Sequence, residues 1–173
     1  LENDNIMLGD GQIDNADKYR SFALDGTIVR HEYIHLVVNR IYPIINFGEF
    51  GALSEGLADY FAMASFWRDP AFVSLTTLGN YVGAGEGSAR DISGLGHPTT
   101  ERKMPDGWNG EVHEDSLMFS QALYKLRMNP TYDLGSFTTG AYAGQHRTDV
   151  FAYAALFYFP DNFANFMDAM TDA

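Results

Sequence analysis

Hydrophobic residues of this chain recur at helical spacing in several segments, which are separated by proline and glycine. The first clear case covers residues 26–41, where Ile28 and Val38 lie on one stripe together with two histidines. Asp25 is a suitable N-cap residue, and Pro43 stops the helix just beyond the stripe. The pattern predicts an amphipathic helix over residues 26–41.

Four further helices are expected from the same spacing and from their breakers. They cover residues 53–67, residues 115–128 with Pro130 beyond, a segment that Thr148 or Asp149 could cap and that Pro160 breaks, and a last segment from Asp161 through Phe163, Phe166 and Met167. Residues 1–24 are predicted to contain a strand or two, residues 68–112 an irregular functional loop, and residues 132–147 a linker rich in glycine and threonine.

The predicted fold class is therefore α+β and mainly α-helical, with a short N-terminal β region and a helical C-terminal part. A length of 173 residues suits one compact domain with a sizeable core. We expect residues 1–50 to form the end of an N-terminal subdomain and residues 51–173 to form a helical C-terminal subdomain.

The segment His31-Glu32-Tyr33-Ile34-His35 carries the most specific chemistry. Two histidines four residues apart on a helix project from one face, where neutral imidazoles can hold one Zn²⁺. Glu32 occupies a neighbouring position and can take a proton from a metal-bound water without being a ligand. A chance match has a probability on the order of 1 %, so a third ligand is needed to support the interpretation.

Glu55 is the candidate third ligand. It follows His35 after nineteen residues, which is enough for the first helix to end and a second to begin. Asp59 stands four residues further on and can face the same way, where it would hold one ligand histidine in the right tautomer. A His31, His35 and Glu55 site leaves the fourth position open to water, as in catalytic zinc sites. The alternative interpretation of Glu55 and Asp59 is an ordinary solvated acidic face.

These motifs resemble those of the thermolysin-like neutral metallopeptidases, which are zinc endopeptidases. Residues 51–59 are close to that family's glutamate motif, with Ser54 where the family usually has Asn. Residues 31–40 and 108–127 resemble more closely the related fungalysins. The resemblance implies a zincin-type active-site helix, and it covers most of the chain but only about half of a full thermolysin-like catalytic unit.

The resemblance also implies three further site residues. Residues 108–116 resemble the family segment that carries the transition-state histidine, which here is His113, a donor to the oxyanion. Arg90 matches the arginine that binds the substrate backbone, and Asn46 stands where the family often has a tyrosine. The aspartate that usually orients the transition-state histidine is replaced by Trp108, so that Asp106 and Glu111 are the candidates for this task.

Charge and composition narrow the range of partners. The net charge is −12, which argues against nucleic acid as a partner, and the chain has no cysteine, which excludes thiolate zinc sites and a thiol nucleophile. No membrane-spanning run is present, and we expect a secreted or extracellular monomer. The chain begins with Leu rather than Met, which fits a fragment of a longer precursor.

Other polar residues have weaker signals. An acidic cluster could hold Ca²⁺ through oxygen ligands, although it lacks an EF-hand pattern and a solvated turn is the simpler interpretation; it comprises Asp10, Gln12, Asp14 and Asp17. His97 and His146 are interpreted as surface residues.

The sequence thus predicts a zinc-dependent endopeptidase that acts on peptides or proteins through a metal-activated water. Two alternatives remain open, namely a related exopeptidase and an inactive metal-binding domain.

Overall fold

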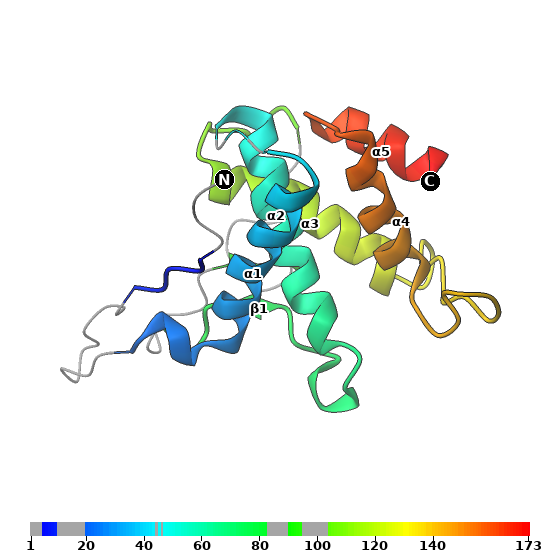
Figure 1. The fold of residues 1–173 in the computed structure, drawn as a ribbon, viewed down its shortest axis with the longest axis horizontal. Coiled ribbons are helices and arrows are strands. Elements are labelled where there is room, and N and C mark those ends of the chain that lie inside the picture. Colours follow the sequence, from blue (N-terminus) through cyan, green and yellow to red (C-terminus); the bar gives the residue numbers. More distant parts are fainter. Residues whose placement is uncertain (1–4, 10–19, 44, 46, 83–89, 95–103) are drawn as a thin grey trace.

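The computed structural model describes residues 5–9, 20–43, 45, 47–82, 90–94 and 104–173. Two long helices near its centre determine the position of the candidate site (Figure 1). Helix α1 spans Gly26–Ile41, and the Asp25 carboxylate caps it by accepting a hydrogen bond from Thr27 N. Tyr42 ends it in an extended conformation immediately before Pro43. The prediction for this helix is confirmed at both ends.

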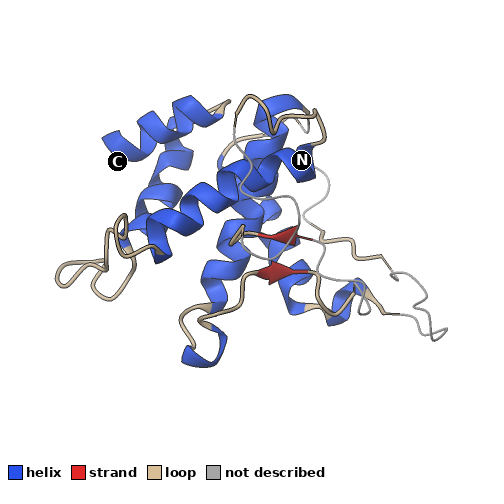
Figure 2. Ribbon diagram, turned by 180° about the vertical axis from the view of Figure 1, so that it is seen from behind, coloured by secondary structure: helices blue, strands red, loops and turns tan. Residues whose placement is uncertain are grey.

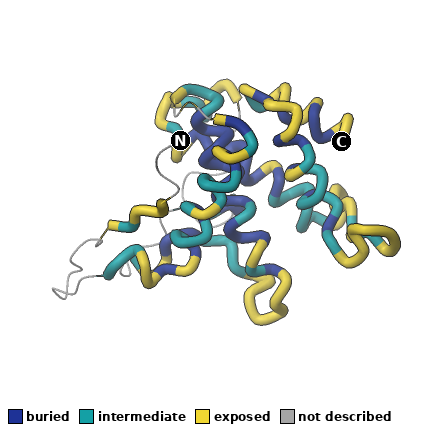
Figure 3. Tube along the Cα trace, viewed as in Figure 1, coloured by how far each residue is buried: buried dark blue, intermediate teal, exposed yellow. Residues whose placement is uncertain are grey.

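Helix α2, Gly48–Phe66, is the central element of the fold. It packs against α1 on one side and against α3, Val112–Met128, on another. Thirteen of its residues are buried, which is why the buried part of the trace in Figure 3 follows this helix. The interior of the molecule is thus built around the helix that carries Glu55 and Asp59.

The start of α2 differs from the prediction. The helix begins at Gly48 instead of residue 53, so Ser54 lies inside the helix and does not cap it. The Glu49 side chain in the first turn accepts a hydrogen bond from Phe163 N at 2.7 Å, a long-range contact that local spacing does not reveal. The expected boundary between residues 50 and 51 therefore falls in the first turn of α2.

A close approach between α2 and α3 depends on Gly56. A Cβ atom on this residue would lie 2.9 Å from Phe119 Cδ1 and 2.9 Å from the Ser116 carbonyl oxygen. Real Cβ atoms do not come this close to neighbouring atoms, so any larger residue would push the two helices apart. Because Gly56 follows Glu55 directly, this contact also fixes the distance of Glu55 from α3.

The β part of the fold is small, and it lies elsewhere than predicted. Strands β1, Thr77–Leu78, and β2, Arg90–Asp91, pair antiparallel within the stretch that was expected to be irregular (Figure 2). Strands of two residues are too short to give a periodic pattern in the sequence. In the N-terminal region, described residues 5–9 and 20–24 contain no strand, although Phe22 N donates to Gly9 O.

The C-terminal part is helical, as expected, and packs beside α3 (Figure 1). It consists of α4, Arg147–Ala155, a short 3₁₀ helix at Leu156–Tyr158, and α5, Phe163–Asp172. The mainly helical α+β class is therefore confirmed. None of the helices in the described part of the chain combines the length and hydrophobicity needed to cross a bilayer.

His146 was predicted to be a surface residue, and this was wrong. It is buried and caps α4, because its Nδ1 accepts a hydrogen bond from Thr148 N at 3.2 Å. Its Nε2 lies 2.7 Å from Asp133 Oδ1. A histidine in a polar linker thus serves as a cap, a role that neither Thr148 nor Asp149 fills.

Candidate metal centre

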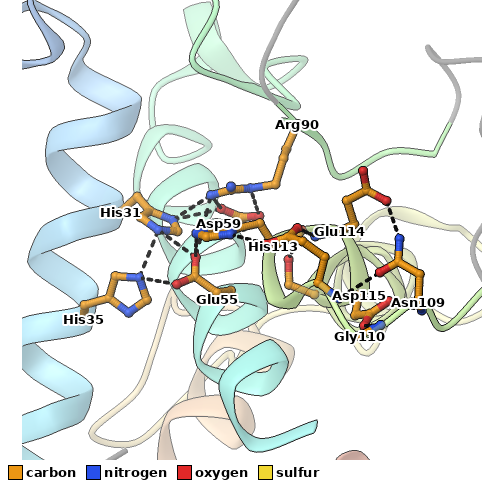
Figure 4. A network of polar contacts seen from close by, with 12 residues as sticks. His31, His35, Glu55, Asp59, Arg90, Asn109, Gly110, His113, Glu114 and Asp115 are labelled. Atoms are coloured by element: carbon orange, nitrogen blue, oxygen red, sulfur yellow. Dashed lines mark hydrogen bonds and ion pairs between the residues drawn. The ribbon is translucent and has the colours of Figure 1, made fainter. Parts of the chain in front are cut away.

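Two faces of α1 and α2 bring together the residues that the sequence predicted as ligands. His31 Nε2 lies 3.0 Å from His35 Nε2 and 3.2 Å from Glu55 Oε2. His35 Nε2 lies 3.3 Å from Glu55 Oε1. Figure 4 shows these three side chains pointing toward one another from the two helices. The group of His31, His35 and Glu55 could hold a metal ion.

The spacing of the donor atoms fits one small cation. Tetrahedral zinc with bonds of about 2.0–2.1 Å places its ligand atoms about 3.3–3.4 Å apart, close to the distances between these three side chains. Glu55 Oε2 is buried and accepts no hydrogen bond of good geometry, even though His31 Nε2 is near. A buried carboxylate oxygen without a hydrogen bond is costly, and a metal ion would remove that cost.

Two other residues of α2 fix the orientation of the histidines. His31 Nδ1 lies 2.8 Å from Asp59 Oδ1, and His35 Nδ1 lies 3.2 Å from Ser54 Oγ. Because both Nδ1 atoms have partners, both Nε2 atoms are directed toward Glu55. An outer partner of this kind fixes the tautomer and the ring orientation of a ligand histidine. The predicted role of Asp59 agrees with this geometry.

The electrostatics of the site reflect these contacts. Burial lowers the pKa of His31, but its contacts with the Asp59 and Glu55 carboxylates outweigh burial and raise this pKa from 6.5 to about 9. Burial would raise the pKa of Glu55, whereas its contacts with His31 and His35 hold it well below the usual range. Without a metal, the site is therefore held together by a protonated imidazole and a carboxylate.

Arg90 approaches the site from strand β2. Its Nε and Nη2 atoms donate to the two carboxylate oxygens of Asp59 at 2.7 and 2.8 Å, a bidentate contact in which Asp59 is fully buried. Burial would raise the pKa of Asp59, but Arg90 and His31 keep it below its usual range. Arg90 Nη2 lies 3.9 Å from Glu55 Oε2. The arginine that was predicted to bind substrate thus contacts the carboxylate behind His31.

His113 lies in the first turn of α3, close to the ligand group. Its Nε2 is 3.6 Å from Glu55 Oε2, and its Nδ1 is 2.7 Å from Glu111 Oε1. Of the two candidates for orienting His113, Glu111 makes this contact. The other oxygen of Glu111 accepts a hydrogen bond from Glu114 N and so caps α3. The Glu111 side chain therefore both caps α3 and orients His113.

An open pocket of about 260 Å³ joins these groups. It is lined by His31, Glu32, His35, Asn39, Ser54, Glu55 and His113. Glu32, the predicted base, lies on α1 between the two ligand histidines and is partly buried at this pocket. The predicted ligands, base and oxyanion donor thus share one space that solvent and a substrate can enter.

Several predicted residues lie outside the part of the chain that the structure describes. These are Asn46, His97 and the acidic cluster of Asp10, Gln12, Asp14 and Asp17 proposed for Ca²⁺.

Sequence reasoning missed two residues that position the site. Asp115 is fully buried, and its carboxylate accepts hydrogen bonds from Asn109 N at 3.0 Å and Gly110 N at 2.8 Å, which fixes the turn before α3. The sequence marked Ser54 only as the residue that stands where the family usually has Asn. Ser54 directly precedes Glu55 on the turn of α2 that faces α1, and this position could have indicated its contact with His35.

No protein-family model matches this sequence, and no curated protein has a significant match to it.

Proposed function

We propose that this protein is a zinc-dependent endopeptidase. The observation that carries this proposal is the group of His31, His35 and Glu55, with Glu55 Oε2 buried and without a hydrogen bond, beside a pocket that also holds a glutamate and a histidine. Two imidazoles and one carboxylate form a ligand set typical of catalytic zinc. When bound, zinc lowers the pKa of its water and polarises the scissile carbonyl.

The residues of the chain then divide the remaining tasks. Glu32 accepts the proton of the attacking water and later passes it to the leaving amine. His113 donates an N–H from Nε2 to the oxyanion that develops on the carbonyl oxygen. Glu111 accepts the Nδ1–H of His113, which keeps Nε2 directed into the pocket. Asp59 and Ser54 hold the ligand histidines, and Arg90 holds Asp59 as well as being the candidate for contact with the substrate backbone.

The metal and the base can be tested separately. Purified chain is loaded with zinc, its metal content is measured, and cleavage of casein is followed. We expect one zinc per chain and measurable hydrolysis. Glu32→Gln should retain the zinc and lose hydrolysis by about 10²–10⁴-fold, the usual contribution of a general base.

Glu49→Gln is the matched control, because Glu49 is a glutamate on the neighbouring helix that does not line the pocket. It should retain both zinc and activity. Hydrolysis at the wild-type rate by Glu32→Gln would refute the role given to Glu32. A wild-type chain that binds zinc and cleaves nothing would instead favour the inactive metal-binding domain.

Substrates labelled at one end distinguish the remaining alternative. An endopeptidase releases internal fragments from the labelled peptide, whereas an exopeptidase releases only terminal residues. We expect internal fragments, because the pocket is open and the described residues that line it include no lysine or arginine that could bind a terminal carboxylate.

A further inference from the structure

A second and larger pocket lies on another part of the molecule. Its volume is about 520 Å³, against about 260 Å³ for the pocket at the metal centre. It is formed beside α4, the orange helix of Figure 1, with contributions from α2 and from the segment before α4. Its size is within the range of about 300–1,000 Å³ found for small-molecule sites.

Four of the eight residues that line this pocket are aromatic. Phe61 comes from α2, Tyr142 from the segment before α4, Tyr153 from α4, and Phe157 from the 3₁₀ helix that follows. Tyr142, Tyr153 and Phe157 are 52 %, 46 % and 54 % exposed. The rings of Tyr153 and Phe157 pack edge to face with centroids 5.5 Å apart. Large aromatic rings held together but left half in water suggest a surface that a ligand covers.

The pocket also contains one acidic side chain. Asp149 Oδ1 accepts a hydrogen bond from the Tyr60 hydroxyl at 2.6 Å and lies 3.2 Å from Arg127 Nε. Both contacts use the same oxygen, so the second oxygen, Oδ2, has no hydrogen-bond partner within the described residues. The carboxylate is thus held in place from the protein side and can still accept a donor from the pocket.

The neighbouring arginines do not fill this site. Arg127 lies over the Trp67 ring at 5.1 Å, and Arg147 lies over the Phe137 ring at 5.0 Å while donating to Leu134 O. No lysine, arginine or histidine of the described chain lines the pocket. Arg127 balances the Asp149 carboxylate at Oδ1 from the protein side, so a positive charge that faces the four rings and Oδ2 from within the pocket would come from a ligand.

We propose that this pocket binds a small organic cation, namely an ammonium group carried on an apolar body. The faces of aromatic rings attract such cations, and Asp149 supplies a charged acceptor. An anionic ligand would be repelled by Asp149. A purely apolar ligand would bury this carboxylate without replacing the hydrogen bonds that it makes to water, and such burial of a charge is costly. The net charge of −12 further favours a cation.

A pair of probes that differ only in charge tests this proposal. Choline and its uncharged isostere 3,3-dimethylbutan-1-ol are titrated into the purified protein, and aromatic side-chain NMR signals are followed. We expect saturable binding of choline, with shifts at Tyr142, Tyr153 and Phe157. The isostere should bind at least about fivefold more weakly, as the loss of a cation–π contact predicts.

Two variants locate the effect, and one controls for it. Tyr153→Leu keeps an apolar side chain but removes a ring face, and Asp149→Asn keeps an oxygen for Tyr60 but removes the charge. Each should weaken choline binding at least about threefold. Tyr132→Leu changes an equally exposed tyrosine outside the pocket and should have no effect.

Equal affinity for choline and the isostere would overturn the proposal. So would choline binding that survives both pocket variants, or the absence of saturation by choline. Peptidase activity plays no part in these measurements, so the result is independent of the function proposed for the metal centre.

Discussion

Glu111 Oε1 lies 2.7 Å from His113 Nδ1, while the other oxygen of Glu111 caps the helix that carries this histidine. The contact directs the opposite nitrogen, Nε2, toward Glu55 at 3.6 Å. Burial would raise the pKa of Glu111, but its contacts with His113 and the hydrogen bond from Glu114 N together keep this pKa below its usual range. The Glu111 carboxylate accepts the Nδ1–H of His113, and Nε2 can then donate to the oxyanion when it carries the second proton of the ring.

The first prediction therefore concerns Glu111→Gln. This variant keeps an amide oxygen that can cap α3, but it removes the negative charge beside His113. We expect kcat for casein hydrolysis to fall about tenfold, the lower end of the range for partners of site residues. Zinc content and the thermal midpoint should stay close to those of the wild type. An unchanged kcat, or a loss of zinc, would contradict the orienting role.

The second prediction concerns the buried pair of Asp59 and Arg90. Asp59→Asn leaves the Arg90 guanidinium buried without its carboxylate and also weakens the support of His31. Breaking such a pair from one side costs about 3–5 kcal/mol, so we expect a loss of about 3 kcal/mol in the free energy of unfolding of the metal-free protein. Zinc affinity should fall about 10–100-fold.

The double variant Asp59→Asn with Arg90→Met provides the control for this pair. Removal of the second charge should restore part of the lost stability, because no unpaired guanidinium remains. Urea unfolding of the wild type, Asp59→Asn and the double variant measures this difference. A double variant less stable than Asp59→Asn alone would show that the two residues do not act as a pair.

Much of the metal centre was predictable because it depends on local spacing. The separation of four residues between His31 and His35 fixes their shared face, and Asp25 and Pro43 mark the ends of α1. Glu55 and Asp59 share the facing side of α2 for the same reason. These residues needed only helical geometry and the chemistry of ligands to be recognised.

The remainder depends on contacts between distant segments, which spacing does not encode. The early start of α2 involves Glu49 and Phe163, far apart in the sequence, and β2 is too short to be seen as a strand. The partner of Arg90 also follows from tertiary structure, since Asp59 lies 31 residues away. The family resemblance predicted Arg90 to lie near the site, but it did not indicate that the Arg90 guanidinium donates two hydrogen bonds to Asp59.

The third prediction concerns the close contact at Gly56. Gly56→Ala places a methyl group against Phe119 and the Ser116 carbonyl oxygen, and the backbone oxygen cannot move without shifting α3. Overpacking of this kind costs about 1–3 kcal/mol, and we expect a loss of that size in urea unfolding. The shift also moves His113 away from Glu55, so kcat should fall more than zinc affinity.

Ala52→Gly on the same helix is a suitable comparison. It changes helix propensity at a buried position without adding an atom to the interface. This variant should lower stability. Unlike Gly56→Ala, it should not lower kcat more than it lowers zinc affinity. If Gly56→Ala were as stable and as active as the wild type, the close packing of α2 on α3 would not be required.

The last prediction concerns protons and zinc at His31. The pKa of His31 in the metal-free fold is raised from 6.5 to about 9 by Asp59 and Glu55, against the opposing effect of burial. The protonated ring therefore stabilises the metal-free fold; this contribution is fully present below about pH 6.5 and is lost as the pH rises through about 9. Zinc needs the unprotonated nitrogen and must displace this proton.

Zinc affinity should accordingly rise with pH, by about tenfold per unit from pH 7 until it levels off near pH 9. Competition with a chelator of known proton affinity measures this slope, and calorimetry in buffers of different ionisation enthalpy counts the released proton. The thermal midpoint of the metal-free protein should fall over the same range, so that the gap to the zinc-loaded protein widens. A zinc affinity that does not change between pH 7 and 9 would mean that His31 is already neutral before the metal binds, and that the contacts with Asp59 and Glu55 do not hold a proton there.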